Sequence, residues 1–401
     1  MGGSYTPQIQ EDMSRLGAKM PFEQVLEEID SSHHVWVSEA TVRRTTYESG
    51  VAAEALVRAE VTSLSAADAP PASAKPEKLL VSVDGALVHL TSGEWREVKS
   101  VAVGEFSCQW DSQAGEYVTH SHDLSYFSRS YRAREFEQAA LAELYQRGLD
   151  NAQTVVAVND GAAWIQQFID YHCPGAVRII DFSHVLEYIA AAGKAIWGEG
   201  SEAFKQWFAR MAHQLKHHPP QRTLAELRLL LPKAKTESQL DSLDSAIFYI
   251  QSRLQMMDYP HFRHRGYPIG SGSVESSHKG VVQARLKLAG MRWAPAHVDP
   301  MLALRNLVCN HRWADTWPKI VAYRRQLLWQ KRREAIAQRQ SKPASQPAKR
   351  LSLADLMVAP SPQPQPPPQP KSSRPSADHP WRNNLWPTRE AWRWASPQTQ
   401  Y

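Results

Sequence analysis

Residues 78–84, KLLVSVD, and residues 154–160, TVVAVND, carry most of the information about the fold of this chain. Each is a short apolar run that ends in an aspartate before a glycine, a pattern typical of buried β-strands. Further β-rich runs lie at 94–107 and 177–182, and helices are predicted at 126–147 and 161–172. Hairpin strands followed by strand-helix alternation predict an α/β fold with a mixed sheet flanked by helices, a class that includes the ribonuclease-H-like arrangement.

The composition is that of a globular protein with two or three packed domains, because 42% of the 401 residues are hydrophobic and 22% are charged. No window approaches eighteen uncharged apolar residues, and the N-terminus has acids where a signal peptide needs an apolar stretch, so we expect a cytoplasmic protein. The cysteines at 108, 173 and 309 are far apart, which argues against a disulfide framework or a zinc ribbon.

Basic charge is concentrated in one part of the chain. Residues 1–260 have 23 Lys and Arg against 34 Asp and Glu, whereas residues 261–350 have 18 against 4. Such a block suits a surface that binds a polyanion, because each neutralised phosphate releases counterions. A solvated basic helix is the simpler alternative.

Composition and periodicity divide the chain into seven segments. We expect a helical segment that suits DNA binding, a linker, a first part of the α/β core, an all-α insertion, a second part of the core with basic helices, a Pro-rich disordered linker and a Trp-rich tail. Their boundaries are 1–68, 69–77, 78–190, 191–265, 266–340, 341–376 and 377–401.

The N-terminal segment contains two expected helices. Phe22, Val25, Leu26 and Ile29 follow Pro21 at helical spacing, and Ser38 is placed to cap a helix that runs from 39 to 49 and stops at Gly50. The second helix has Arg43 and Arg44, which suits a helix-turn-helix that reads DNA, although the spacer is longer than usual. A helical bundle that packs on the next domain is the alternative.

Three acids are candidates for chemistry. Asp84 and Asp160 end apolar strands, where a ligand at the sheet edge can reach them, and Glu275 lies at a helix start in GSGSVESSHKG. Each has a simpler explanation: Asp-Gly also forms hairpin turns, Asp160 can cap the next helix, and a carboxylate is favoured at a helix N-terminus. In a ribonuclease-H-like sheet the three would meet and hold two Mg²⁺ or Mn²⁺ ions for in-line phosphoryl transfer.

Other polar residues flank these acids in the sequence. Asp181 and His184 start a helix, where His184 orients a carboxylate, contacts phosphate or packs in the core. Lys279 either pairs with Glu275 or contacts phosphate. Arg285, Lys287 and Arg292 suit phosphate contacts, and Trp293 suits stacking on an unpaired base.

Three motifs resemble those of a known family. VVAVNDGAAWI, RIIDFSHVLEYI and GSGSVESSHKGVVQARLKLAGMRW, in this order, closely resemble the signatures of DDE transposases of bacterial insertion sequences, specifically the ISKra-type group and its ISLre-type and Mutator-like relatives. The resemblance covers roughly residues 6–315 and ADHPWR near the C-terminus. It implies a ribonuclease-H-like core with Asp84, Asp160 and Glu275 as the acidic triad, an all-α insertion between Asp181 and Glu275, and supporting roles for Asp181 and His184.

The resemblance therefore implies a transposase that binds the terminal inverted repeats of its element, cleaves DNA and joins it to target DNA in the nucleoid with Mg²⁺ or Mn²⁺. Because two DNA ends must be joined, we expect at least a homodimer on DNA. The alternative is a catalytically inactive or domesticated DNA-binding protein. A glycosidase with two carboxylates would leave the basic block unexplained.

Overall fold

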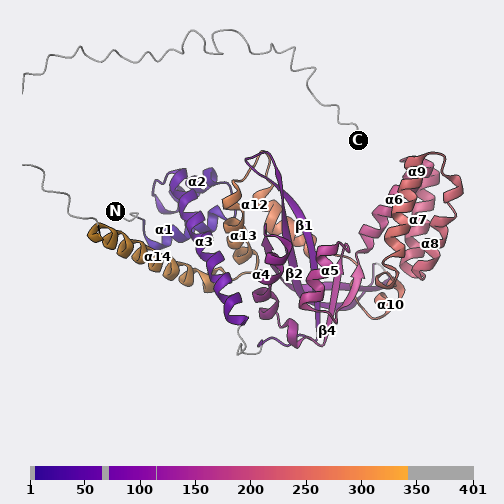
Figure 1. Ribbon diagram of the computed structural model, residues 1–401, viewed down its shortest axis with the longest axis horizontal. Helices are drawn as coiled ribbons and strands as arrows, with labels where there is room; N and C mark the ends of the chain where they lie inside the picture. Colours follow the sequence, from indigo (N-terminus) through magenta and orange to yellow (C-terminus); the bar gives the residue numbers. More distant parts are fainter. Residues whose placement is uncertain (1–4, 66–71, 114, 342–401) are drawn as a thin grey trace, which may run out of the picture. The chain divides into compact units, whose positions relative to one another are not determined.

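Five strands form one mixed sheet in the computed structural model, which describes residues 5–65, 72–113 and 115–341 (Figure 1). The strands are β1 (Lys78–His89), β2 (Trp95–Asp111), β3 (Glu116–Arg129), β4 (Thr154–Asn159) and β5 (Val177–Ile180). Their order is β3-β2-β1-β4-β5, with antiparallel pairing from β3 to β1 and parallel pairing from β1 to β5. The predicted mixed sheet of an α/β fold is confirmed.

The two faces of β1 pack on different helices because side chains alternate along a strand. Leu79, Val81 and Val83 belong to a buried cluster with helices α4 (Ala133–Gln146) and α5 (Ala163–His172). Leu80 points the other way, into a cluster with the helices that follow β5. Since the strand carries apolar residues on both faces, its sequence is a nearly continuous hydrophobic run.

The chain between β5 and residue 265 is helical, as its periodicity predicts. The helices there are α6 (Phe182–Trp197), α7 (Glu202–His217), α8 (Pro220–Arg228), α9 (Glu237–Gln251) and α10 (Tyr259–His264). Helices α6 to α9 pack against one another as a bundle (Figure 1). Tyr259 ties this segment to the sheet, because its buried hydroxyl donates a hydrogen bond to the carbonyl of Ile180 at 2.9 Å.

A third buried cluster joins the N-terminal helices to the end of the described chain. It includes α1 (Pro7–Gly17), α2 (Phe22–His33), α3 (Glu39–Leu64), α13 (Pro295–Cys309) and α14 (Trp313–Ser341). The predicted cap of α3 is confirmed, since Ser38 Oγ accepts a hydrogen bond from the Thr41 amide. The predicted stop at Gly50 is wrong. Helix α3 continues past Gly50, where a Cβ would lie 2.3 Å from the carbonyl oxygen of Pro300, so this glycine lets α3 and α13 approach closely.

Two further boundaries differ from the sequence-based expectation. The helix predicted over 126–147 begins only at Ala133, because residues 126–129 complete β3. Asp84 does not end its strand, and the alternative of a hairpin turn at Asp84-Gly85 is also wrong. Antiparallel pairing with β2 continues from Asp84 opposite Ser100 to His89 opposite Trp95.

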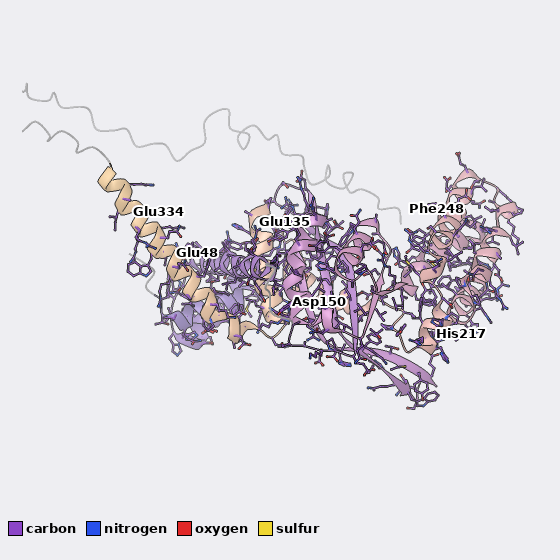
Figure 2. All side chains as sticks on the ribbon, turned by 60° about the horizontal axis from the view of Figure 1, so that its bottom comes forward. Glu48, Glu135, Asp150, His217, Phe248 and Glu334 are labelled. Carbon is purple, nitrogen blue, oxygen red and sulfur yellow. The ribbon has the colours of Figure 1, made fainter. Side chains whose placement is uncertain are left out.

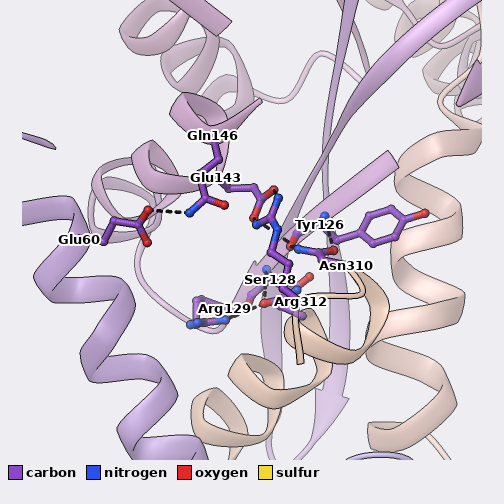
Figure 3. A network of polar contacts seen from close by, with 9 residues as sticks. Glu60, Tyr126, Ser128, Arg129, Glu143, Gln146, Asn310 and Arg312 are labelled. Atoms are coloured by element: carbon purple, nitrogen blue, oxygen red, sulfur yellow. Dashed lines mark hydrogen bonds and ion pairs between the residues drawn. The ribbon is translucent and has the colours of Figure 1, made fainter. Parts of the chain in front are cut away.

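Helix α13 and the residue after it, Asn310, supply hydrogen-bonding side chains to the outer edge of β3 (Figure 3). Asn310 Oδ1 accepts from the Tyr126 amide at 2.8 Å, and Asn310 Nδ2 donates to the Tyr126 carbonyl at 2.9 Å. Asn306 Oδ1 accepts from the amide of Ser128 and from the guanidinium of Arg129. Main-chain groups that no further strand pairs are thereby satisfied.

Residues 1–334 form one compact unit, and a second begins at Ala335. The Pro-rich and Trp-rich segments predicted at 341–376 and 377–401 lie outside the described residues, apart from Ser341 at the end of α14, as do residues 69–71 of the linker predicted at 69–77. In the described part of the chain, no helix has the length and apolar character needed to cross a membrane.

Candidate active site

Asp84 on β1 and Asp160, directly after the neighbouring parallel strand β4, lie at the same level of the sheet. The last parallel pair of β1 and β4 is Val81 with Ala157. Asp84 comes three residues after Val81, and Asp160 comes three residues after Ala157. Asp181 reaches this level as well, because Ile180 of β5 pairs with Asn159 of β4. Parallel pairing therefore places three aspartates that are far apart in the sequence at one level of the sheet.

Asp84 lies between two apolar clusters that cover the same face of β1. On its face of the strand, Leu80 packs under the helices that follow β5, and Ala86 and Val88 pack under the cluster of α3 and α13. The pKa of Asp84 is raised to about 6, chiefly by burial and further by the charges of Asp160 and Asp181. A bound cation would stabilise neighbouring carboxylates of this kind, because it offsets the repulsion between their negative charges.

The environment of Asp160 is fixed by residues from α9 and its C-terminal end. Tyr249 donates a hydrogen bond from its hydroxyl to the main-chain carbonyl of Asp160 at 2.5 Å, and burial raises the pKa of this tyrosine. Arg253 lies over the Tyr249 ring at 4.3 Å and donates to the carbonyl of Gly161. Asp160 Oδ1 accepts from the Ala162 amide at 2.8 Å, so the main chain holds one of its two carboxylate oxygens.

Asp181 links the end of β5 to two other elements. It caps α6 by accepting from the His184 amide at 2.9 Å and from the Ser183 hydroxyl, while its other oxygen accepts from the Ser271 amide. Burial acts to raise the pKa of Asp181, but the hydrogen bonds from Ser183 and Ser271 outweigh it, so the pKa lies below its usual value. Asp181 therefore fixes the loop before the helix that carries Glu275.

His184 belongs to the polar surroundings of the three aspartates. Its Nδ1 lies 3.2 Å from a carboxylate oxygen of Glu187, and its ring contacts Tyr188 and Tyr249 edge to face. The charge of His184 also lowers the pKa of Asp84, against the effect of burial. The helix begins directly after Asp181, as the sequence predicts.

Glu275 is exposed on α11 (Gly272–Ser277), with its carboxylate 3.9 Å from Lys279 Nζ. The ion pair is the simpler of the two alternatives considered for Lys279. Helix α11 is followed by a six-residue π-helix, His278–Gln283, and by α12 (Ala284–Leu286). Within the described residues, no three Asp, Glu, His or Cys side chains lie close enough together to hold a metal ion. The structure thus brings Asp84 and Asp160 together but does not gather all three predicted acids into a metal site.

His278 is a site residue that the sequence analysis missed. Its Nδ1 lies 3.5 Å from Asp84 Oδ2, and its buried Nε2 has no hydrogen-bond partner among the described residues. Burial lowers the pKa of this histidine. A signal was present, because His278 follows Glu275 by three residues and thus lies on a neighbouring part of the same helical turn.

Arg285 and Trp293 require a correction. Both were predicted to contact DNA, but their exposed fractions are 1% and 4%. The Arg285 guanidinium lies 4.9 Å from the Phe22 ring and 4.9 Å from the Trp293 ring, and its Nε donates to the carbonyl of Gly17 at 2.9 Å. Burial lowers the pKa of Arg285 to about 10. These residues join α1 and α2 to the chain after α12 and are not available to a phosphate or a base.

Four other predicted DNA contacts are exposed. Lys287 and Arg292 lie on the segment between α12 and α13. Arg43 and Arg44 lie on the outer face of α3, where Arg43 pairs with Glu39 of the same helix. The opposite face of α3 packs on α1 and α13, which is the bundle packing weighed as the alternative to a helix-turn-helix.

A scan of the chain against models of protein families finds no match, and a search of curated proteins finds none either.

Proposed function

We propose that this chain is a DDE-type transposase of a bacterial insertion sequence, which cleaves DNA at the ends of its element and joins them to target DNA. The observation that carries the proposal is the position of Asp84 and Asp160 at one level of neighbouring parallel strands. The raised pKa of Asp84, caused chiefly by burial, supports a role in which a positive charge binds beside it.

The topology supports a ribonuclease-H-like core. Such a sheet has an acid on its first strand, an acid on a neighbouring strand and a third on a late helix. Here the strand order β3-β2-β1-β4-β5 puts Asp84 on the central strand and Asp160 directly after the next. The helical segment between Asp181 and α11 is the counterpart of the insertion that the resemblance implies.

The residues offer the hard oxygen donors that Mg²⁺ and Mn²⁺ prefer. Asp84 and Asp160 fit one end of a two-ion site, whereas Glu275 points toward Lys279. When bound, the ions would stabilise the negative charge on the attacking and leaving oxygens of an in-line displacement. Asp84 and Asp160 would hold the metal ions, and Asp181 fixes the loop before α11. Lys279, Lys287 and Arg292 are exposed and contact DNA phosphates.

A strand-transfer assay tests this proposal. The substrates are duplexes copied from the genomic DNA that flanks the coding region, with a supercoiled plasmid as target, in Mg²⁺ or Mn²⁺. We expect joined product from the unchanged chain and none from Asp84→Asn, Asp160→Asn or Glu275→Gln, because positioning and charge neutralisation carry this chemistry. Glu199→Gln is the matched control, since Glu199 is an exposed acid that pairs with Lys194 and contacts no residue of the site.

A second function is a DNA-binding protein without catalysis, and one observation favours it. Glu275 is exposed and paired with Lys279 instead of facing Asp84 and Asp160. This alternative predicts salt-sensitive binding of the same duplexes without divalent metal, unchanged by the three acid substitutions, and no joined product from any variant. That combination would replace the transposase proposal.

A further inference from the structure

A groove lies between α3, α13 and the part of α14 up to Lys331, and its cavity is about 670 Å³. Apolar side chains line it, and two of them are strongly exposed: Val51 is 50% and Leu328 is 59% accessible. The ring of Tyr47 stacks on His297 at 3.8 Å and gives the groove a rigid aromatic wall. Apolar surface that is left uncovered in this way is typical of a site that binds a partner.

The rim of this groove is positively charged. Arg43, Arg44, Arg324 and Lys331 line it together with one acid, Glu48. Arg324 pairs with Glu48 at 2.8 Å, and Arg43 pairs with Glu39. Within the residues that the structure describes, Arg44 and Lys331 form no ion pair. The groove therefore suits a partner that is apolar along its centre and acidic beside it.

Helix α9 presents a stripe of that chemistry. Its exposed face carries Glu237, Leu240, Asp241, Asp244 and Phe248, at helical spacing of three and four residues. Phe248, labelled in Figure 2, is 73% accessible, and Leu240 is 41% accessible. The three acids of the stripe form no ion pair with any residue that the structure describes.

We propose that the α9 stripe of a second copy of this chain lies in the groove between α3, α13 and α14. Phe248 and Leu240 cover Val51 and Leu328, and Asp241 and Asp244 lie beside Arg44 and Lys331. A helix in an apolar groove is a common mode of recognition. DNA fits the groove less well, because phosphates match its rim and leave its apolar lining uncovered.

If each copy donates its α9 to the other, the two contacts form a closed symmetric dimer. The proposal does not rest on the proposed function, since it concerns a surface away from Asp84 and Asp160. It concerns the free protein, so no DNA or metal is needed to observe it.

Sedimentation velocity of the full chain over a range of concentrations tests the contact. We expect a concentration-dependent dimer that is weakened roughly thirtyfold or more by Phe248→Asp, as for an aromatic at the centre of an interface. Leu229→Asp is the matched control, because Leu229 is 72% accessible in the same helical segment but lies outside the stripe. This variant should dimerise like the unchanged chain.

Charge reversal identifies the two surfaces. The variant Arg44→Glu with Lys331→Glu and the variant Asp241→Lys with Asp244→Lys should each be monomeric, and a chain with all four substitutions should dimerise again. Melting curves establish that each variant is folded. A monomeric unchanged chain, a dimer indifferent to these substitutions, or a four-substitution chain that stays monomeric would overturn the proposal. So would a monomer that binds a DNA duplex through Arg44 and Lys331.

Discussion

The hydroxyl of Tyr249 donates a hydrogen bond to the main-chain carbonyl of Asp160. Tyr249 belongs to the helical segment between β5 and α11, and Asp160 follows the strand β4. The contact connects a segment with no acid of the predicted triad to the position of a triad residue. The helical segment is therefore part of the site's framework.

Replacing Tyr249 with Phe removes this hydrogen bond and leaves a carbonyl without its partner. We expect a loss of about 1 kcal/mol of unfolding free energy. The rate of strand transfer should fall by more than the small loss of folded protein can explain, because Asp160 loses a positional constraint. Urea unfolding and the joining assay measure the two effects. Tyr171→Phe, at a 57% accessible position, is the control and should change neither quantity.

Asp181→Asn should destabilise the protein by about 1–3 kcal/mol at pH 7, because hydrogen bonds from three donors converge on this carboxylate. The pKa of Asp181 is lowered in the folded state, so its stabilisation is complete above its usual value of 3.8 and is lost as the pH falls through the lower, folded value. Urea unfolding from neutral to acid pH measures the difference from the unchanged chain. A penalty that stays constant down to the lowest pH would contradict this account.

Asp84→Asn should stabilise the metal-free protein at neutral pH. The folded chain keeps the Asp84 proton up to about pH 6, whereas an unfolded chain releases it near 3.8, so stability falls as the pH rises between these values. The side chain is 39% accessible, so solvent screening reduces the expected gain to about 1 kcal/mol. Urea unfolding with EDTA should show the gain at pH 7 and none near pH 4; equal stability at both would refute the prediction.

Gly50→Ala should cost about 2 kcal/mol or more, although alanine is the better helix former. The added Cβ would lie 2.3 Å from the Pro300 carbonyl oxygen, so α3 and α13 would have to move apart. Thermal unfolding measures the loss. Gly175→Ala is the control, because no atom lies within 4 Å of its added Cβ. A gain in stability from Gly50→Ala would show that the two helices separate easily.

Local patterns in the sequence were enough to predict most of the sheet and many helices. The apolar runs of β1 and β4, the cap at Ser38 and the helical periodicity after Val185 all depend on neighbouring residues. Strand β3 was missed because its stability comes from pairing with β2 and from Asn306 and Asn310. Gly50 was misread because a distant carbonyl, not a helix end, requires a glycine there.

The candidate site was predicted only in part. The apolar runs before Asp160 and Asp181 predict that both follow strands, as the structure has them, and Asp84 reaches the same level although its strand continues. Nothing near Tyr249 indicates that it reaches Asp160, and only the three-residue spacing from Glu275 points to His278, since both contacts depend on tertiary packing. Arg285 looked like a surface cation, but two aromatic rings from different segments enclose it.

Asn306 of α13 and Asn310 at its C-terminal end also affect how copies of the chain can associate. An exposed strand edge is a template on which a neighbouring chain can add a strand, and such growth leads to aggregation. Around Tyr126 and Ser128 the template is blocked, because amide side chains already occupy its donors and acceptors. Strand addition is thus blocked over this part of β3, and an ordered assembly there has to use the surfaces of the helices that cover it.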